Sequence, residues 1–371
     1  MNKEQNKLKL LAIPDILKIK TYQPGKPIEE VKRELGLKKV IKLASNENLL
    51  GPSPKAVKAI KNYASMTNFY PNGSGYYLKK ALAEKLGLED SRIILGNGSD
   101  EIVSLITRVF LQKGEETIMG NPSFLMYGID TQLSQARVIS IPLNDFRLDL
   151  SAMAKAISPK TKLIFISNPN NPTGTIVKKD EVKSFLKEIP SRILVIFDEA
   201  YSEYVEDKDY PQTIDLIDGE NNVIVLRTFS KIYGLAGLRV GYGIAKSEIM
   251  EILNRARPPF NVNSLAQVAA LASLKDKNQI TRSRKLVKEG KKFLYSHLKR
   301  LKLSFIPTEA NFILIKIGEK TSDVEKRLLK EGIIVRRMGA YNLSDCIRVT
   351  IGTKKQNEEF IKALDKVLSS T

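Results

Sequence analysis

The chain has 371 residues, of which 42% are hydrophobic and 27% are charged. This length exceeds the roughly 250–300 residues at which a single hydrophobic core stops growing, so we expect two structural units. The composition is that of an ordinary folded protein and excludes a disordered, collagen-like or disulfide-rich chain.

Two residue types that occur only once limit the possible sites. The single cysteine, Cys346, can form no intrachain disulfide and no multi-cysteine metal site, and the single histidine, His297, excludes an HExxH site. We therefore predict no metal site. A Ser-His-Asp triad would depend on His297 alone, and no GxSxG motif supports one.

The charge and the hydropathy bear on the partners. A formal net charge of +19 would attract a polyanion. However, the densest basic stretch, residues 282–302, carries Leu294, Leu298 and Leu301 at helical spacing, which indicates an amphipathic helix with a solvated basic face. Zinc-finger, RNP and zipper patterns are missing, so we expect no nucleic-acid partner. No apolar run reaches the roughly 18–20 residues of a membrane helix, and the first residues lack the apolar core of a secretory signal. We therefore expect a cytoplasmic protein without membrane association.

From about residue 75, helical segments alternate with short apolar runs. A helix is expected over residues 78–87, followed by a strand at 92–95 and a second helix that begins in the segment GNGSDE. Three more apolar runs, each ending in polar or small residues, lie at 163–167, 193–197 and 222–226. This alternation predicts a mainly parallel sheet with helices on both faces, an α/β domain of three αβα layers.

The pattern changes after residues 255–264. Long lysine-rich helices follow, together with apolar runs at 311–317, 332–338 and 346–352, which predicts a smaller α+β domain. Pro258-Pro259 is a suitable hinge, because proline cannot continue a helix. The predicted units are an N-terminal arm (1–45), a large domain (46–258) and a small C-terminal domain (259–371).

Polar side chains follow four of the predicted strands. They are Gly98 and Ser99 after the first strand, Asn171 after the second, Asp198 and Tyr201 after the third, and Thr228, Ser230, Lys231 and Arg239 after the fourth. In an open α/β sheet, ligands bind at the carboxyl ends of the strands. We therefore expect these side chains to converge on one edge of the sheet.

This set of side chains suits pyridoxal phosphate. Its aldehyde needs a lysine amine for a Schiff base, and Lys231 is the candidate. Its protonated ring nitrogen needs a buried carboxylate, for which Asp198 is placed, and its phenolate oxygen can accept hydrogen bonds. The donors for that oxygen are Tyr201 and Asn171. Its phosphate suits the helix N-terminus near Ser99, with Ser230 and Arg239.

Taken singly, each of these signals has a simpler interpretation. The dipeptides Asn-Pro and Thr-Gly punctuate loops in many proteins, Lys231 could be a solvated charge, and Asp198 could cap a helix. Asp100, in the first turn after Ser99, is a poor neighbour for a phosphate. The combination, in this order after successive strands, favours the cofactor site.

Three motifs resemble those of the fold-type I pyridoxal-phosphate aminotransferases: SNPNNPTG (167–174), FDEAYSEY (197–204) and RTFSKIYGLAGLRVGY (227–242). Within that superfamily the chain is most similar to the histidinol-phosphate aminotransferase family, over residues 14–360. The stretches that carry this second resemblance are 22–36, 42–48, 51–54, 70–75, 308–314, 332–336 and 346–353.

The resemblance implies a fold-type I large domain and a role for each matched residue. Lys231 would bind the cofactor and move a proton between its C4′ and the substrate Cα, and Asp198 would pair with its ring nitrogen. Phe124 would stack on the ring. The other residues assigned to cofactor binding are Gly98, Ser99, Asn171, Tyr201, Thr228, Ser230 and Arg239.

A homodimer with shared active sites also follows from the resemblance. Tyr70 is similar to the tyrosine that reaches the cofactor phosphate of the neighbouring subunit, and Tyr22 to the N-terminal tyrosine that lies over the neighbour's substrate site. The chain departs from the family at Leu49 and Leu50, where proline often follows SNEN. It also has Phe124 in place of the more usual tyrosine, which keeps the stacking face and removes a hydroxyl.

Two arginines are the candidates for substrate recognition. Arg348 resembles the arginine that binds the substrate carboxylate in aminotransferases, and a guanidinium can bind a phosphate in the same bidentate fashion. Arg336 resembles a second anion-binding arginine. Successive side chains of a strand point to opposite faces, so only one of Arg336 and Arg337 can face the site. Asn48 and Asn311 are further candidates for the lining.

The family implies transfer of an amino group between L-histidinol phosphate and 2-oxoglutarate, which gives imidazole-acetol phosphate and L-glutamate, in histidine biosynthesis. An aromatic or broad-specificity aminotransferase is the nearest alternative, followed by a threonine-phosphate decarboxylase. These activities differ in the bond to Cα that is aligned with the ring π system.

Overall fold

The structure is a computed structural model that describes residues 11, 14–19, 21 and 25–369. Within the described residues, the larger sheet contains seven strands. In spatial order they are β2 (Ile93–Gly96), β8 (Gly241–Ile244), β7 (Asn222–Thr228), β6 (Leu194–Asp198), β5 (Thr161–Ser167), β3 (Glu116–Asn121) and β4 (Arg137–Pro142). Strands β3 to β7 run parallel, and β8 lies antiparallel between β2 and β7. The predicted mainly parallel sheet is confirmed.

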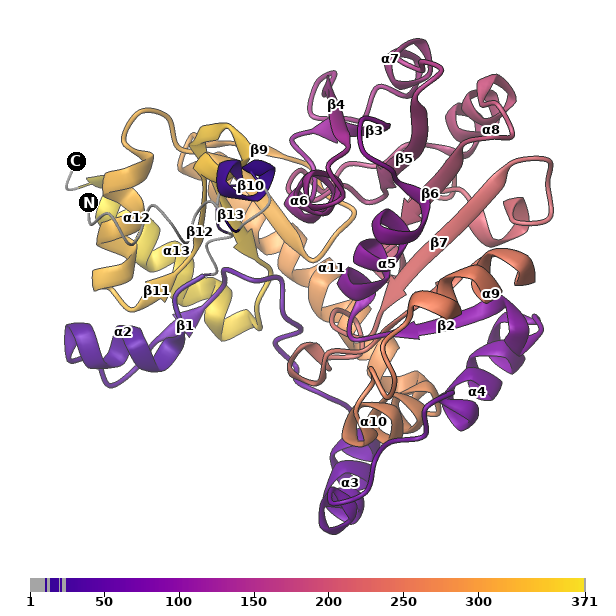
Figure 1. Cartoon of the computed structure of the whole chain (residues 1–371). Helices are drawn as coiled ribbons and strands as arrows, with labels where there is room; N and C mark the ends of the chain where they lie inside the picture. The colour runs from indigo at the N-terminus through magenta and orange to yellow at the C-terminus, as the bar shows by residue number, and fades with distance from the viewer. Residues whose placement is uncertain (1–10, 12–13, 20, 22–24, 370–371) are drawn as a thin grey trace.

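Helices cover both faces of this sheet (Figure 1). Leu194 and Ile196 of β6 belong to one hydrophobic cluster with α5, α6 and α9, whereas Val195 and Phe197 belong to another with α4, α7 and α8. Alternate residues of a strand point to opposite faces, so this division confirms the three layers. The helices between residues 54 and 274 are α3 (Pro54–Tyr63), α4 (Tyr76–Leu86), α5 (Ser99–Phe110), α6 (Leu125–Leu133), α7 (Leu150–Lys155), α8 (Lys179–Glu188), α9 (Ser247–Ala256) and α10 (Ser264–Leu274).

A smaller antiparallel sheet lies beside the first. Within the described residues its strands are β12 (Arg336–Met338), β13 (Leu343–Thr350), β10 (Phe312–Lys316) and β9 (Ser304–Ile306), in that spatial order. The helices around it are α2 (Ile28–Leu35), α11 (Lys277–Arg300), α12 (Thr321–Lys330) and α13 (Lys354–Ser369). The strand predicted at 332–338 is broken in two, because β11 (Ile333–Ile334) pairs with β1 (Ile41–Lys42) and β12 pairs with β13.

The predicted domain boundaries stay a prediction. Helix α10 follows the hinge proposed at Pro258-Pro259, but it packs against α3 and α4 of the large domain (Figure 1). Helix α11 then carries the chain to the small sheet. Part of the predicted arm also packs there, because Val31 and Ala44 share a hydrophobic cluster with Ile334.

The basic stretch 282–302 forms most of α11. Leu294 and Leu298 are buried, and the His297 ring packs against Phe293, with 4.1 Å between the ring centroids. In the described part of the chain, no helix is long and apolar enough to cross a membrane. No group of three or more His, Cys, Asp and Glu residues there could hold a metal ion.

We expect the Asp130→Asn variant to be more stable than the parent protein at pH 7.5. Asp130 on α6 is 4% exposed; Oδ1 accepts a hydrogen bond from Ser104 at 3.0 Å, and Oδ2 has no partner among the described residues. Burial raises its pKa to about 6.

A carboxyl group with a higher pKa in the folded state favours folding at low pH, and this contribution is lost as the pH rises through the folded pKa. The Asp130→Asn variant should therefore gain about 1–3 kcal/mol in its free energy of unfolding at pH 7.5 and little at pH 4. Urea denaturation at the two pH values tests this. An equal effect at both would contradict it.

Candidate active site

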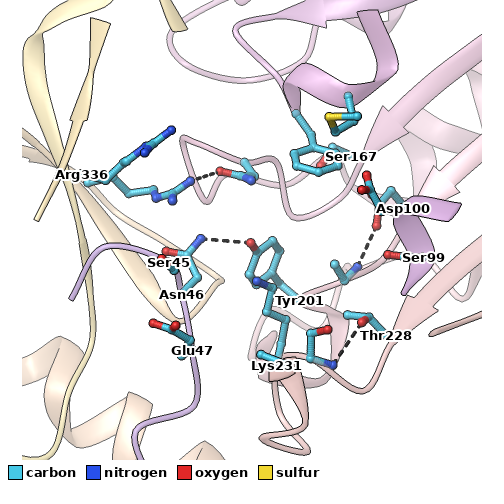
Figure 2. Close-up of a pocket in the computed structure, with 18 of the residues that line it drawn as sticks. Ser45, Asn46, Glu47, Ser99, Asp100, Ser167, Tyr201, Thr228, Lys231 and Arg336 are labelled. Atoms are coloured by element: carbon cyan, nitrogen blue, oxygen red, sulfur yellow. Dashed lines mark hydrogen bonds between the residues drawn. The ribbon is translucent and has the colours of Figure 1, made fainter. Parts of the chain in front are cut away.

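A cavity of about 540 Å³ lies at the carboxyl ends of β5, β6 and β7, facing β12 and β13 of the small sheet. Figure 2 shows Ser167, Tyr201, Thr228 and Lys231 on one side of it and Arg336 across from them. Most of the residues predicted for the site line this cavity: Ser99, Phe124, Asn171, Asp198, Tyr201, Thr228, Ser230, Lys231, Arg239, Arg336 and Arg348. The structure therefore brings together side chains from segments far apart in the sequence.

Two of the lower-ranked lining candidates lie outside the cavity. The Asn48 amide donates hydrogen bonds to the carbonyl of Ile232 at 2.7 Å and to the Ser283 hydroxyl at 2.8 Å. These bonds connect its loop to the turn after β7 and to α11, outside the cavity. The Asn311 amide donates to the carbonyl of Asn46 at 3.0 Å. Asn311 thus contacts the backbone of a cavity residue rather than the cavity itself.

Of the two tyrosines expected to act in trans, Tyr70 does not line the cavity of its own chain. Tyr70 is 81% exposed, and its ring is stacked on that of Phe260 with centroids 4.7 Å apart. Tyr22 lies outside the described residues.

Lys231 lies in a tight turn after β7. The Ser230 amide donates to the Thr228 hydroxyl at 3.1 Å, and the Gly234 amide donates to the Lys231 carbonyl at 3.0 Å. Gly234 has a φ of +70°, and a Cβ there would lie 2.5 Å from the carbonyl oxygen of Gly51, so this turn requires glycine. Burial, followed by the charge of Arg348, lowers the pKa of Lys231 to about 8.

Asp198 is the last residue of β6, and it is 6% exposed. Its Oδ1 accepts a hydrogen bond from the Ala200 amide at 3.1 Å, and its Oδ2 accepts one from the Tyr127 hydroxyl at 2.6 Å. Burial raises the pKa of Asp198 to about 6, against the effect of these two donors. The carboxylate is therefore charged at neutral pH in an enclosed place.

Ser99, Ser230 and Arg239 form a cradle at the N-terminal end of α5. Gly98 has a φ of +82°, and a Cβ on it would lie 2.6 Å from the Arg239 guanidinium. Arg239 Nη1 lies 3.4 Å from the Ser230 hydroxyl that it donates to. Free amides at a helix N-terminus and a guanidinium together favour an anion, so this cradle can hold a phosphate.

Arg348, on β13, is 6% exposed and lies on the opposite side of the cavity. Its Nη1 donates a hydrogen bond to the Asn171 side chain, and its Nη2 donates to the Ala44 carbonyl at 3.1 Å. Its Nε is buried without a hydrogen-bond partner among the described residues. The guanidinium also lies 5.2 Å from the centre of the Phe312 ring. A fixed guanidinium of this kind can bind a carboxylate or a phosphate.

The structure distinguishes Arg336 from Arg337. Arg336 is opposite Arg348 in the β12–β13 register and lines the cavity. Arg337 points away and donates to the Ser322 hydroxyl at 2.8 Å. This outcome follows from strand alternation, which allows only one of two successive side chains to face the site.

Asn46 and Tyr127, which the sequence analysis did not assign to the site, each donate a hydrogen bond to a predicted site residue. Asn46 is 1% exposed, and its amide donates to the Tyr201 hydroxyl at 3.0 Å, as the dashed line in Figure 2 shows. It belongs to the SNEN stretch, as does Asn48, which lies outside the cavity. Tyr127, which donates to Asp198, lies three residues after Phe124. The helical spacing of these two aromatic residues was the available signal.

Comparisons with known proteins identify the family. Residues 38–364 match the model of the family "Aminotransferase class I and II". The chain is 52% identical to the histidinol-phosphate aminotransferase of Moorella thermoacetica, over 95% of this chain and 92% of that protein. It is 50% identical to the one of Caldicellulosiruptor saccharolyticus, over 94% and 98% of the two chains.

Among solved structures, the histidinol-phosphate aminotransferase of Sinorhizobium meliloti in complex with pyridoxal-5'-phosphate superposes with a TM-score of 0.89. It is 27% identical, over 97% of this chain and 98% of that one. Both the sequence and the fold thus match along nearly the whole chain. The chain belongs to the class I and II aminotransferases and, within them, to the histidinol-phosphate aminotransferases.

Proposed function

We propose that this protein transfers an amino group between L-histidinol phosphate and 2-oxoglutarate, with imidazole-acetol phosphate and L-glutamate as the products. The observation that carries this proposal is that a lysine amine and a buried arginine face one cavity from opposite sheets. Lys231 offers an amine with a pKa of about 8, and Arg348 offers a guanidinium whose Nε is unpartnered among the described residues. The substrate presents an amino group, which reacts at the cofactor that Lys231 holds, and an anion, which Arg348 can bind.

Pyridoxal phosphate, the cofactor of this enzyme class, supplies when bound an aldehyde for the substrate amine and a ring that takes up electrons from Cα. The residues around the cavity fit it. The cradle of Ser99, Ser230 and Arg239 suits its phosphate, and a Cβ at Gly98 would fill that space. Asp198 supplies the buried carboxylate for its ring nitrogen, and Phe124 supplies a face for stacking.

The protein's own groups then divide the work. Lys231 Nζ holds the cofactor and afterwards accepts and returns a proton, which a pKa of about 8 permits near neutral pH. The Tyr201 hydroxyl accepts a hydrogen bond from the Asn46 amide. The centre of the Tyr201 ring lies 5.4 Å from Lys231 Nζ. Arg348 binds the anionic end of the substrate, and Arg336 lies beside it as a second cation. One arginine site can thus serve a phosphate ester and a dicarboxylate in turn.

An absorbance titration of the purified protein with bound pyridoxal phosphate tests the proposal. We expect histidinol phosphate to remove the visible band of the bound cofactor and 2-oxoglutarate to restore it. Equal conversion by phenylalanine or tyrosine would widen the function to aromatic transamination. Release of carbon dioxide from threonine phosphate, without conversion by histidinol phosphate, would replace it by decarboxylation.

We also propose that the protein acts as a homodimer. Large exposed side chains occur in the segment before α4, in its first turn and in the loop before α10, and we name this set the aromatic patch; the Tyr70 and Phe260 rings are stacked, and the Tyr76 and Tyr77 rings are in edge-on contact. The aromatic patch contains Met66, Phe69, Tyr70, Tyr76, Tyr77 and Phe260. Exposed apolar patches mark interaction sites. The partner that we propose is a second copy of the chain, because Tyr70 would then reach the cofactor phosphate of the neighbouring subunit. The cytoplasmic location stays a prediction.

We expect Phe69→Asp to shift the protein from dimer to monomer and to lower activity with it. Phe69 is 59% exposed within the aromatic patch, and burying an unpaired carboxylate against a second copy is strongly unfavourable. Sedimentation equilibrium and a parallel activity assay measure this. Leu133→Asp, at a residue 43% exposed on α6, is the matched control and should remain dimeric. A Phe69→Asp variant that stays dimeric would exclude this face.

A further inference from the structure

Tyr127 is a fully buried tyrosine whose hydroxyl ends at the site. It lies on α6, is 0% exposed and donates a hydrogen bond to Asp198 Oδ2 at 2.6 Å. Its ring is stacked on Phe165 of β5, with centroids 4.5 Å and planes 4° apart, and Phe124 lies edge-on to it at 5.4 Å. Packing on two sides holds the ring in place, so the hydroxyl has a fixed position beside the carboxylate.

The charge of Asp198 depends on several groups that face it from different elements. Burial and Asp100 on α5 raise its pKa, whereas Tyr127 on α6, the Ala200 amide and Lys231 after β7 lower it. Tyr201, after β6, is the other titratable neighbour. Among the groups that favour the ionised form of Asp198, Tyr127 has the largest effect. Burial also raises the pKa of Tyr127 well above its ordinary value, so its hydroxyl remains a donor throughout the neutral range.

We propose that Tyr127 is a positioning residue of this reaction, which keeps the Asp198 carboxylate ionised and correctly oriented for the ring nitrogen of pyridoxal phosphate. The inference deepens the proposed function and rests on it for the identity of the reaction. Its test measures only the binding of the cofactor and needs no substrate. Tyr127 needs no contact with the substrate, because it acts through Asp198.

The first experiment measures cofactor affinity against pH in the Tyr127→Phe variant. This change removes one oxygen and keeps the stacked ring, so the packing on Phe165 is retained. At pH 7.5 we expect the affinity for pyridoxal phosphate to fall about tenfold to a hundredfold, the usual effect of losing a hydrogen bond to a charged group. The affinity should rise with pH as Asp198 ionises, and the midpoint of this rise should lie at higher pH in the variant.

A matched control and a double variant separate positioning from packing. Tyr295→Phe also removes the hydroxyl of a stacked tyrosine, since Tyr295 lies 4.6 Å from Phe305 and accepts a hydrogen bond from the Thr308 amide. It should leave the affinity and its pH midpoint unchanged. In an Asp198→Asn background, adding Tyr127→Phe should have no further effect on cofactor affinity.

Two results would overturn the inference. One is an unchanged pH midpoint in Tyr127→Phe, and the other is an equal loss of affinity in the presence and absence of the Asp198 carboxylate. Neither measurement uses histidinol phosphate. Failure of the proposed substrate would therefore leave these results intact, and failure of the inference would leave the substrate assignment intact.

Discussion

We expect the Lys231→Ala variant to lose transamination by at least about 10⁴-fold, the upper range that general acid–base catalysis supplies, because its nucleophilic amine is lost as well. Burial, followed by the charge of Arg348, lowers the pKa of Lys231 to about 8, so a solvated lysine cannot replace it. The cradle of Ser99, Ser230 and Arg239 is unchanged in the variant. Cofactor should therefore still bind, but gel filtration should remove it more readily than from the parent protein.

Lys291→Ala is the matched control for this result. Lys291 is a buried lysine on α11, 7% exposed, and it pairs with Glu206 at 3.1 Å, away from the cavity. Its removal should lower stability and leave the turnover of the folded protein unchanged. If Lys291→Ala and Lys231→Ala lost similar activity per folded molecule, Lys231 would not be the reacting amine.

The cavity residues on the large sheet could be predicted from the sequence because the sheet geometry is simple. Asp198 and Thr228 each end a parallel strand, so their neighbours must meet at one edge. Lys231 follows Thr228 by three residues and therefore lies close to that edge. The apolar runs and the polar residues that follow them therefore indicate these positions, and no long-range contact has to be known.

The opposite wall of the cavity depended on contacts that periodicity does not report. Arg348 reaches Asn171 across 177 positions of the sequence, and Asn46 reaches Tyr201 across 155. Asn46 and Asn48 are both polar residues of one short stretch, and the sequence does not distinguish them. Only the backbone decides which of them enters the cavity, and at Asn46 it has a φ of +57°.

Tyr127 was missed for a different reason. A tyrosine on a buried helix face is usually part of the core, and its ring is indeed packed between Phe165 and Phe124. Its function depends on the last atom of the side chain, the hydroxyl. The sequence pattern predicts that the ring is buried, but it does not predict the partner of the oxygen.

The second large effect is expected at the other end of the substrate. Arg348→Lys keeps a positive charge and loses the fork that donates to Asn171 and to the Ala44 carbonyl. A lysine presents a point charge and cannot bind a phosphate through two parallel hydrogen bonds. We expect kcat/KM for histidinol phosphate to fall about 10²–10³-fold, which corresponds to one or two hydrogen bonds to a charged group. The reaction with glutamate should weaken as well, because we propose that the same arginine binds its carboxylate.

Steady-state kinetics of both half-reactions, with cofactor affinity measured separately, test this expectation. Arg337→Lys is the control, because Arg337 is next to Arg336 but donates to Ser322 outside the cavity. It should retain the parent kcat/KM. If Arg336→Lys lost activity while Arg348→Lys retained it, the phosphate would bind to Arg336 instead. The separate measurement of cofactor affinity in Arg348→Lys distinguishes loss of substrate binding from loss of cofactor, because Arg348 also donates a hydrogen bond to Asn171.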